Sequence, residues 1–559
     1  MQQYSMLWLR NKLGLIALLI AATLVYAQSM SGDFVIDDIP FIKENPYIRD
    51  ITHVTRFFTK GVWENSAHEI NNEPLYRPMN LVPAMLNHAL WGDNPLGYHV
   101  FLLLLHLANI CLVYALIRKV VAGSTMAATI GAALFALHPA KVESVAWISG
   151  GIDPLVAFFL LAAMLAHRYF IDSIENKSVD GADKKAWWYL ALSLACFQLA
   201  LWSKEVAFIF PLVIVAHDLI YRRKIPWPTV CLQVAIVVVY LLARSHALDK
   251  AGQVSAVDLS QFSRAIDFAL GYSEMLVLPT HIPFYMQPPE HAVSSVLGIV
   301  SAIVIILLAG FSWRSFDRGR KKHLVFSAVW MMGFFWPAIL LAFYTYGFYA
   351  GRYLYVSSAG VAVFVAIYYD YLIAAYPRLK KFVIVSCALI IASYGFVTWK
   401  EIPAWHDAET IYGKIAAVAP ENAVGFIGLG YFYINKGDYV AAEKNFLLAL
   451  KKANTFALRE ECLVVLGTIN GINNKLDQSE SYLQEAVKIN PKNSEGWSGL
   501  GNLAWMRGHP YDAISYYEKA LSARSDNYEA AMNLAIAYDQ TGQSQRGDLI
   551  RQQASAMRH

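Results

Sequence analysis

Cysteine and charge are both scarce in this sequence of 559 residues. The five cysteines show no CxxC or metal-ligand spacing, because four lie inside apolar stretches and Cys462 stands alone. We therefore expect neither disulfides nor a zinc site. Only 16% of the residues are charged and 57% are hydrophobic, which is too apolar for a soluble enzyme of this length. The composition predicts a polytopic membrane protein.

The sequence also lacks a concentrated patch of charge. Its formal net charge is +4, and the basic residues occur in short clusters between apolar stretches, which argues against nucleic acid as a partner. The apolar stretches themselves are long enough, or nearly long enough, to cross a bilayer. Eleven such helices are expected, at about 13–27, 97–117, 124–140, 152–170, 187–203, 205–220, 228–244, 291–311, 324–344, 354–373 and 381–399.

The first apolar stretch has two interpretations. Arg10 and Lys12 precede it and Val25-Tyr26-Ala27 offers a small-residue cleavage site, so it could be a signal peptide instead of a permanent helix. Cleavage would leave the downstream topology unchanged.

The basic clusters predict the orientation of the helices. They occur in every second connection, which the positive-inside rule assigns to the cytoplasm: Arg10/Lys12, Arg118/Lys119, Arg222/Arg223/Lys224, Arg318/Arg320/Lys321/Lys322 and Arg378/Lys380/Lys381. The external connections are then those at about 28–96, 141–151, 203–205, 245–290 and 345–353. Eleven crossings from an internal N-terminus also place everything after about residue 400 outside.

Two adjacent carboxylates, Asp37 and Asp38, follow the first apolar stretch directly. Charges so close to hydrocarbon are costly to keep, so a functional role is the first hypothesis. Either carboxylate could deprotonate a hydroxyl or hold a cation. An ordinary acidic start of a loop is the alternative.

Further polar residues fall on the same predicted face. Taken singly, each could be a satisfied interfacial residue, and an arginine there could simply extend to lipid headgroups. Taken together with the acidic pair, they predict a single external site. The set comprises Arg77, His99, His106, Asn109, His138, Glu143, Asp153, Lys204, Glu205, Arg352 and Tyr355.

After Trp399 the pattern becomes soluble, amphipathic and repetitive. Leu429-Gly430, Leu466-Gly467, Leu500-Gly501 and Leu534-Ala535 recur at offsets of 37, 34 and 34 residues, and each is followed by a turn and a second helix. This period, with a small residue at a fixed position, is typical of tetratricopeptide repeats. About four repeats are expected. Such arrays usually bind peptides or partner proteins, although a purely structural cap is the alternative.

Carboxylates beside Arg and Lys at the outer membrane surface suit transfer of a group from an anionic lipid carrier. The carboxylate would act as base on an acceptor hydroxyl, and the cations would stabilise the charge growing on a leaving phosphate. Because nucleotide sugars are not normally available outside the cytoplasm, a membrane-delivered sugar donor is expected.

The sequence resembles the transmembrane-and-TPR-containing protein O-mannosyltransferases over essentially its whole length. The motifs that carry the resemblance are Val35-Ile36-Asp37-Asp38 with Glu44-Asn45-Pro46, Tyr76-Arg77-Pro78, Asn94-Pro95-Leu96-Gly97-Tyr98-His99, Leu137-His138-Pro139 with Glu143, Lys204-Glu205 and Arg352-Tyr353-Leu354-Tyr355. The resemblance implies an all-α GT-C glycosyltransferase domain in residues 1–400, with its catalytic external loop at 28–96, and an extracytoplasmic repeat domain in 401–559. Because many animal members have more repeats, a bacterial inner-membrane protein with a periplasmic site is expected.

The resemblance also implies roles for the site residues. Asp37 and Asp38 would be catalytic, the donor would be a polyprenyl-phosphate mannose or other hexose, and the acceptors would be Ser or Thr hydroxyls of exported proteins. Donor binding would fall to Arg77, His138, Glu143, Lys204, Glu205, Arg352 and Tyr355, with His99 and Asp153 as further candidates. If the enzyme uses a divalent cation, Mg²⁺ or Mn²⁺, its ligands would be Asp38, His138 and Glu143. The family's Gly-Arg-Ala-Asp stretch reads Gly150-Gly151-Ile152-Asp153, so the role of that arginine has no counterpart here.

Two alternatives stay open at this stage. The acceptor could be a lipid or glycan, although a tetratricopeptide groove mainly suits polypeptide. The chain could also be a non-catalytic membrane scaffold that assembles an envelope complex, which would leave the external polar cluster unexplained. A channel or transporter is disfavoured because the polar residues gather on one face and do not mark a path through the bilayer.

Overall fold

A computed structural model describes residues 2–66, 75–120, 122–175, 184–221, 223, 225–248, 262–279, 296–340, 343 and 349–556. All regular elements in these ranges are helices, as predicted. They form two compact units, Met1–Asp407 and Ala408–His559. Arg222, Lys224 and most of the predicted external connection 245–290 lie outside the described residues.

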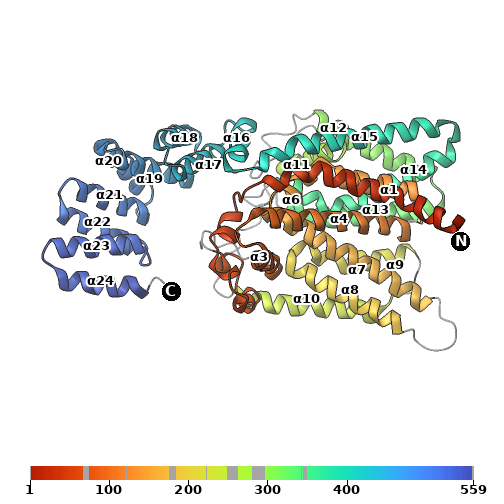
Figure 1. The fold of residues 1–559 in the computed structure, drawn as a ribbon, viewed down its shortest axis with the longest axis horizontal. Helices are drawn as coiled ribbons and strands as arrows, with labels where there is room; N and C mark the ends of the chain where they lie inside the picture. The colour runs from red at the N-terminus through yellow and green to blue at the C-terminus, as the bar shows by residue number, and fades with distance from the viewer. Residues whose placement is uncertain are drawn as a thin grey trace. The chain divides into compact units, whose positions relative to one another are not determined.

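The first unit is a bundle of apolar helices. Within the described residues, nine are long and apolar enough to cross a membrane. They lie side by side with similar axis directions (Figure 1). They are α1 (Gln2–Tyr26), α4 (Pro95–Val120), α7 (Ile152–Glu175), α8 (Lys184–Ser203), α10 (Trp227–Ala247), α12 (Val296–Ser315), α13 (Arg318–Leu340), α14 (Leu354–Ala375) and α15 (Lys380–Glu401).

The other two of the eleven predicted helices form but are short. Helix α5 (Thr125–Leu137) has 13 residues and α9 (Phe210–Ile220) has 11, or about 20 Å and 17 Å at 1.5 Å per residue. Helix α5 ends at His138, which is followed by Pro139 and a 3₁₀ turn. The start of the predicted 205–220 helix is instead the 3₁₀ helix η8 (Glu205–Ile209). Both regular helices are interrupted next to predicted site residues: α5 ends at His138, and η8 begins at Glu205.

Side-chain exposure separates the inner from the outer helices of the bundle. Most side chains of α7 are buried against its neighbours. In contrast, α12 and α15 expose Ile306, Leu307, Phe382 and Leu389, each by about two thirds of its surface. Apolar side chains exposed along whole helices are expected where lipid replaces protein as the neighbour.

The predicted external loop has its own small core. It contains η2 (Ile39–Lys43), η3 (Pro46–Ile48), η4 (Ile51–His53), α2 (Val54–Phe57), η5 (Trp63–Asn65) and α3 (Pro78–Trp91). Phe34, Ile48, Phe57 and Leu81 pack together with Tyr98 at the start of α4. Burial of these apolar side chains fixes the loop on the end of the bundle, so its polar residues are held in place.

The second unit is a row of paired antiparallel helices. After α16 (Ala408–Val418) come four pairs, which match the predicted repeats: α17 (Ala423–Asn435) with α18 (Tyr439–Lys452), α19 (Phe456–Ile472) with α20 (Leu476–Ile489), α21 (Ser494–Met506) with α22 (Pro510–Ala523), and α23 (Tyr528–Gln540) with α24 (Ser544–Ala556). The turn inside each pair contains one residue with positive φ: Gly437, Asn474, Gly508 and Gly542.

The small residue in each repeat is required by close helix packing. A Cβ placed on Gly430, Gly467 or Gly501 would lie 2.5–2.6 Å from an atom of Phe446, Leu483 or Tyr517, respectively, which is 16 residues further along. A larger residue would force the contacting side chain of the partner helix to shift, and the fourth repeat has the next smallest residue, Ala535, at this position. The spacing read from the sequence is therefore a packing requirement between the two helices of a pair.

Candidate functional site

The acidic pair sits on a strained turn. Ile36 has a φ of +51°, a conformation that a β-branched residue rarely adopts. The Asp38 carboxylate is fully buried, and it accepts hydrogen bonds from the backbone N–H of Val35 (3.0 Å) and Ser149 (2.7 Å) and from the Ser149 hydroxyl. Asp37 is only partly buried. The two carboxylates therefore differ: Asp38 anchors the turn, and Asp37 is the more accessible of the two.

Burial determines the protonation of Asp38. It raises the pKa of the Asp38 carboxyl to about 7, and the neighbouring charge of Asp37 adds to this effect. The hydrogen bonds from Ser149 and Val35 favour the anion and oppose the rise.

The connection between α5 and α7 organises the site. It contains η6 (Pro139–Lys141), α6 (Val142–Ala146) and η7 (Ser149–Gly151), and nearly all of it is buried. The Trp147 indole N–H donates to the carbonyl of Val35 (3.2 Å), two residues before Asp37. The Arg352 guanidinium also packs against the Trp147 ring: its central carbon lies 5.1 Å from the ring centre. Trp147 thus links the acidic turn to the start of α14.

Two of the predicted cations are paired with carboxylates beside this connection. Arg352 Nη1 lies 3.1 Å from Glu143 Oε1, and the Arg352 backbone N–H donates to Glu143 Oε2 (3.2 Å). Lys204 Nζ lies 2.6 Å from Asp153 Oδ1 and 4.9 Å from the centre of the Tyr353 ring. Burial raises the pKa of the Glu143 carboxyl, although Arg352 opposes the rise. Each pair joins elements far apart in the sequence.

The third ion pair has an additional cation. Arg77 Nε and Nη2 both contact Glu205 Oε2, at 2.9 and 2.7 Å, and Arg244 Nη1 lies 3.6 Å from Glu205 Oε1. Although burial opposes ionisation, the two arginines hold the pKa of Glu205 below its usual range. The three ion-pair groups contain four cations and three carboxylates, an excess of one positive charge. Such an excess favours an anionic ligand such as a phosphate.

Several predicted site residues instead support the structure behind the ion pairs. The Tyr355 hydroxyl lies 2.6 Å from His106 Nδ1 and accepts from the Asn109 amide (3.3 Å), fully buried between helices. His99 Nε2 lies 3.2 Å from the carbonyl of Gly32, at the start of the external segment. These residues position the segments that carry the site.

His138 also has a structural position. Its Nδ1 accepts from the Ala140 N–H (3.2 Å), so its Nε2–H can donate to the carbonyl of Leu276 (3.3 Å). Its ring packs edge-on against Tyr394. With Nδ1 as an acceptor, the ring is the neutral Nε2–H tautomer.

The proposed ligands for a divalent cation have other partners in this structure. Asp38 accepts from Ser149 and Val35, the two nitrogens of His138 face backbone groups, and Glu143 pairs with Arg352. Among the described residues, these three are not part of a cluster whose ligand atoms could reach one ion. A metal at this site stays a prediction.

Sequence reasoning did not assign roles to four residues that contact the site. They are Lys141, Trp147, Ser149 and Arg244. Lys141 is fully buried, and its ammonium group donates to the Tyr355 carbonyl and the Ser358 hydroxyl at the start of α14. Arg244 could have been found, because it is a basic residue at the external end of its predicted helix, where the positive-inside rule disfavours one. The roles of Trp147 and Ser149 depend on folding alone.

Comparisons with known protein families identify the C-terminal repeats. Two tetratricopeptide repeat family models match residues 507–546 and 460–493. Among solved structures, a crystal structure of MamA matches 26% of this chain and 84% of its own, with 22% identity and a TM-score of 0.24.

Curated relatives cover the membrane helices as well as the repeats. The protein O-mannosyl-transferase F38B6.6 of Caenorhabditis elegans is 27% identical over 79% of this chain, and the protein O-mannosyl-transferase TMTC3 of Homo sapiens is 22% identical over 92%. The chain spans 63% and 65% of the lengths of these two relatives. The homologues of this multi-pass membrane protein are thus the TMTC-family protein O-mannosyltransferases, and tetratricopeptide repeats form its C-terminal region.

Proposed function

We propose that this protein is a glycosyltransferase that moves a hexose from a polyprenyl-phosphate carrier to Ser or Thr hydroxyls of exported proteins. The names of its relatives make mannose the first candidate for the sugar. The observation that carries the proposal is the position of Trp147, which contacts both the acidic turn and Arg352. A potential base and one cation suited to a phosphate, Arg352, are thereby linked by one side chain.

Asp37 is the proposed base. Its carboxylate takes the proton of the acceptor hydroxyl while the hydroxyl oxygen forms a bond to the anomeric carbon of the sugar. The bond from that carbon to the phosphate oxygen breaks, and its electron pair stays on the phosphate. Attack from the face opposite the leaving group inverts the anomeric configuration. The products are a glycosylated protein and a polyprenyl phosphate with one more negative charge.

Arg352 and the neighbouring cations are the proposed phosphate site. Because the leaving phosphate gains charge during the reaction, cations placed in advance stabilise the transition state more than the ground state. Arg352 and Arg77 expose 13% and 22% of their side chains, so neither is fully closed off from the surface of the site. Lys204 and Arg244 add positive charge on the same side.

We place this site on the extracytoplasmic face of a bacterial inner membrane. The support is the distribution of charge along the helices: α4 has Arg118 and Lys119 in its last turn, and His99 of the site region in its first. The positive-inside rule assigns the basic end to the cytoplasm. A lipid-linked donor fits that location, because nucleotide sugars are made and used in the cytoplasm.

The tetratricopeptide array is the proposed acceptor-binding part. Its four helix pairs provide the extended surface that such arrays use to bind polypeptide. This assignment favours a protein acceptor over a lipid or glycan acceptor.

Mass spectrometry of exported proteins tests the proposal. Cells that contain the protein should carry hexose on Ser or Thr of exported chains, and cells without it should lack these modifications. Complementation with D37N should restore the protein in the membrane without restoring the modification. Equal modification in all three strains would contradict the proposed activity, and restoration by D37N would favour the scaffold alternative.

A further inference from the structure

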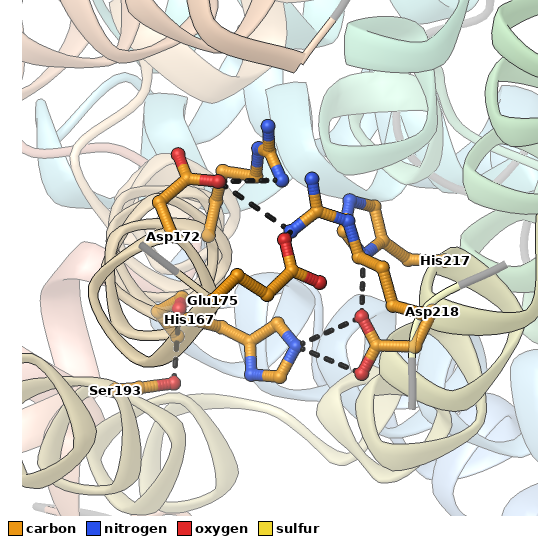
Figure 2. A network of polar contacts seen from close by, with 9 residues as sticks. His167, Asp172, Glu175, Ser193, His217 and Asp218 are labelled. Atoms are coloured by element: carbon orange, nitrogen blue, oxygen red, sulfur yellow. Dashed lines mark hydrogen bonds and ion pairs between the residues drawn. The ribbon is translucent and has the colours of Figure 1, made fainter. Parts of the chain in front are cut away.

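A second cluster of polar side chains lies inside the bundle, away from the proposed active site. His167 of α7 and His217 and Asp218 of α9 are all fully buried. His167 Nε2 lies 3.3 and 3.2 Å from the two Asp218 oxygens, and His217 Nδ1 lies 2.9 Å from Asp218 Oδ1. Figure 2 shows the three side chains converging from two helices. We propose that they form a zinc site that ties α7 to α9.

The donor atoms have the chemistry and spacing that zinc requires. Imidazole nitrogen and carboxylate oxygen bind zinc at about 2.0–2.2 Å, which places neighbouring ligands of a tetrahedral ion about 3.3 Å apart. One donor atom from each of the three side chains lies within 4.8 Å of the others, and no other cluster of this kind occurs among the described residues. Three protein ligands leave one position for a water molecule.

The charge of Asp218 gives the second reason for a cation. In the part of the chain that the structure describes, no lysine or arginine pairs with it. The cations at this end of the bundle, Lys119, Arg168 and Arg223, pair with Asp172 or Glu175. A fully buried carboxylate whose side-chain contacts are two imidazoles has no lysine or arginine to compensate its charge, which is costly within membrane helices. A divalent ion supplies that charge.

The site is separate from the proposed catalytic residues. His167 follows Asp153 by 14 residues on α7, which corresponds to about 21 Å along the helix. The Arg223 backbone N–H donates to the Asp218 carbonyl (2.9 Å), which puts the cluster in the predicted cytoplasmic half of the bundle. Its role is therefore to hold two helices that α8 separates in the sequence.

The surroundings of the histidines predict moderate affinity. Zinc-bound histidines usually donate their second N–H to an acceptor, but among the described residues His167 Nδ1 and His217 Nε2 have no hydrogen-bond partner. The His217 ring instead packs edge-on against Phe326, at 5.5 Å between centres. Loss of such outer partners typically weakens binding about 10- to 100-fold. Zinc should therefore be removable from the folded protein by a strong chelator.

This inference reverses the expectation from the cysteines. Zinc was not expected because no cysteine spacing suited it, but this site uses no cysteine. His167 and Asp218 are 51 residues apart in the sequence and become neighbours only in the bundle.

Elemental analysis of the full chain tests the site. The protein is purified in detergent without a metal-affinity column, and we expect about one zinc per chain, as for other structural sites. The variants H167A, H217A and D218N should each reduce the zinc content about tenfold or more, as expected when a site loses a ligand. The control is H406A: His406 also contacts the next residue, Asp407 (3.1 Å), but the pair is exposed, so its loss should leave the zinc content unchanged.

A second measurement avoids variants that fail to fold. Chelation of the wild-type protein should lower its Tm, zinc should restore it, and cobalt should give the visible absorption bands of a four-coordinate site. Wild-type protein that is folded but contains no zinc, and neither takes up zinc nor cobalt, would overturn the proposal. In that case a protonated histidine balances Asp218.

Discussion

At the scale of residues, adjacent and chemically identical side chains have different roles. Asp38 is buried and holds Ser149, whereas Asp37 is partly exposed at the end of a turn strained at Ile36. The hydrogen bonds of Asp38 hold that strained turn in place, which is the usual way in which strain persists at functional sites. The acidic pair is thus one buried anchor, Asp38, and one more accessible carboxylate, Asp37, which is the proposed base.

The first prediction concerns Asp37, the proposed base. Asp37→Asn should reduce sugar transfer about 10²- to 10⁴-fold, because the general base is lost. Folding and membrane insertion should be unaffected, since the amide has nearly the same shape. Transfer to a synthetic peptide, measured with purified protein and a lipid-linked hexose, gives the rate. A near-normal rate would remove Asp37 from the mechanism.

The second prediction concerns the anchor and pH. Because the folded-state pKa of Asp38 is raised from 3.8 to about 7, the folded protein binds a proton that the unfolded chain releases near pH 4. Stability is therefore fully present below about pH 4 and falls as the pH rises towards 7, by up to roughly 4 kcal/mol.

Asp38→Asn should remove this dependence, because the amide does not titrate. The Tm difference between variant and wild type should thus move in favour of the variant between pH 5 and pH 8. A constant difference over this range would show that Asp38 is already ionised at pH 5.

The third prediction concerns Arg352. Its replacement by Ala should reduce transfer about 10²- to 10³-fold if it stabilises the leaving phosphate. Lysine should restore only part of the rate, because it lacks the planar fork of donors. Arg378→Ala, at an exposed arginine of the opposite end, is the control. Dependence of the rate on donor concentration is the measurement, and unchanged donor kinetics would leave Arg352 with a structural role as the partner of Glu143.

At the scale of elements, the connection between α5 and α7 matters more than any single helix. It supplies Glu143, Trp147 and Ser149. Its path brings residue 150 against the backbone of Glu143, which is possible only because residue 150 is a glycine without a Cβ. A Cβ on Gly150 would lie 2.4 Å from the carbonyl oxygen of Glu143. Backbone cannot move aside as a flexible side chain does, so the glycine is required for packing.

The fourth prediction follows from this close approach. Gly150→Ala should destabilise the membrane unit by about 1–3 kcal/mol, as overpacking typically does, and should disturb the Ser149–Asp38 bond. Gly310→Ala on α12 is the matched control, because nothing lies within 4 Å of its added Cβ. Thermal unfolding in detergent measures both variants. A Tm of Gly150→Ala equal to that of the wild type and of Gly310→Ala would contradict the packing argument.

At the scale of the whole molecule, the chain consists of two units with different internal organisation. Residues up to Asp407 form the bundle with its site, and residues from Ala408 form an array in which each helix pair packs on its neighbours. Arrays of this kind derive their stability from within, so the bundle does not depend on them for its core.

The fifth prediction uses this independence. A chain that ends at Asp407 should still hydrolyse the lipid-linked sugar and glycosylate a short peptide at high concentration. It should lose modification of the natural acceptor, because a tethered binding site can supply an effective concentration in the millimolar range. Mass spectrometry of the acceptor gives the readout, with the membrane level of the truncated chain as the control. Full modification without the array would show that the repeats are dispensable for recognition.

The sequence by itself determined the features that depend on local pattern. Apolar length indicated the helices of the bundle, and a 34-residue period indicated the repeats and the turn inside each. Those turns contain the positive-φ residues Gly437, Asn474, Gly508 and Gly542. These features follow from transfer free energy and backbone sterics, which act over a few residues or one helix pair. The prediction that the polar residues lie at one end of the bundle followed only from the alternation of internal and external connections between successive helices.

Only the tertiary structure decided which of those residues meet. Glu143 and Arg352 are 209 residues apart, Val35 and Trp147 are 112 apart, and nothing in their local sequence specifies the pairing. For the same reason, the sequence did not separate the roles of Asp37 and Asp38 or place Tyr355 behind the site. Contacts between distant segments depend on how whole helices pack, because burial and close packing act on the assembled bundle and not on any one segment.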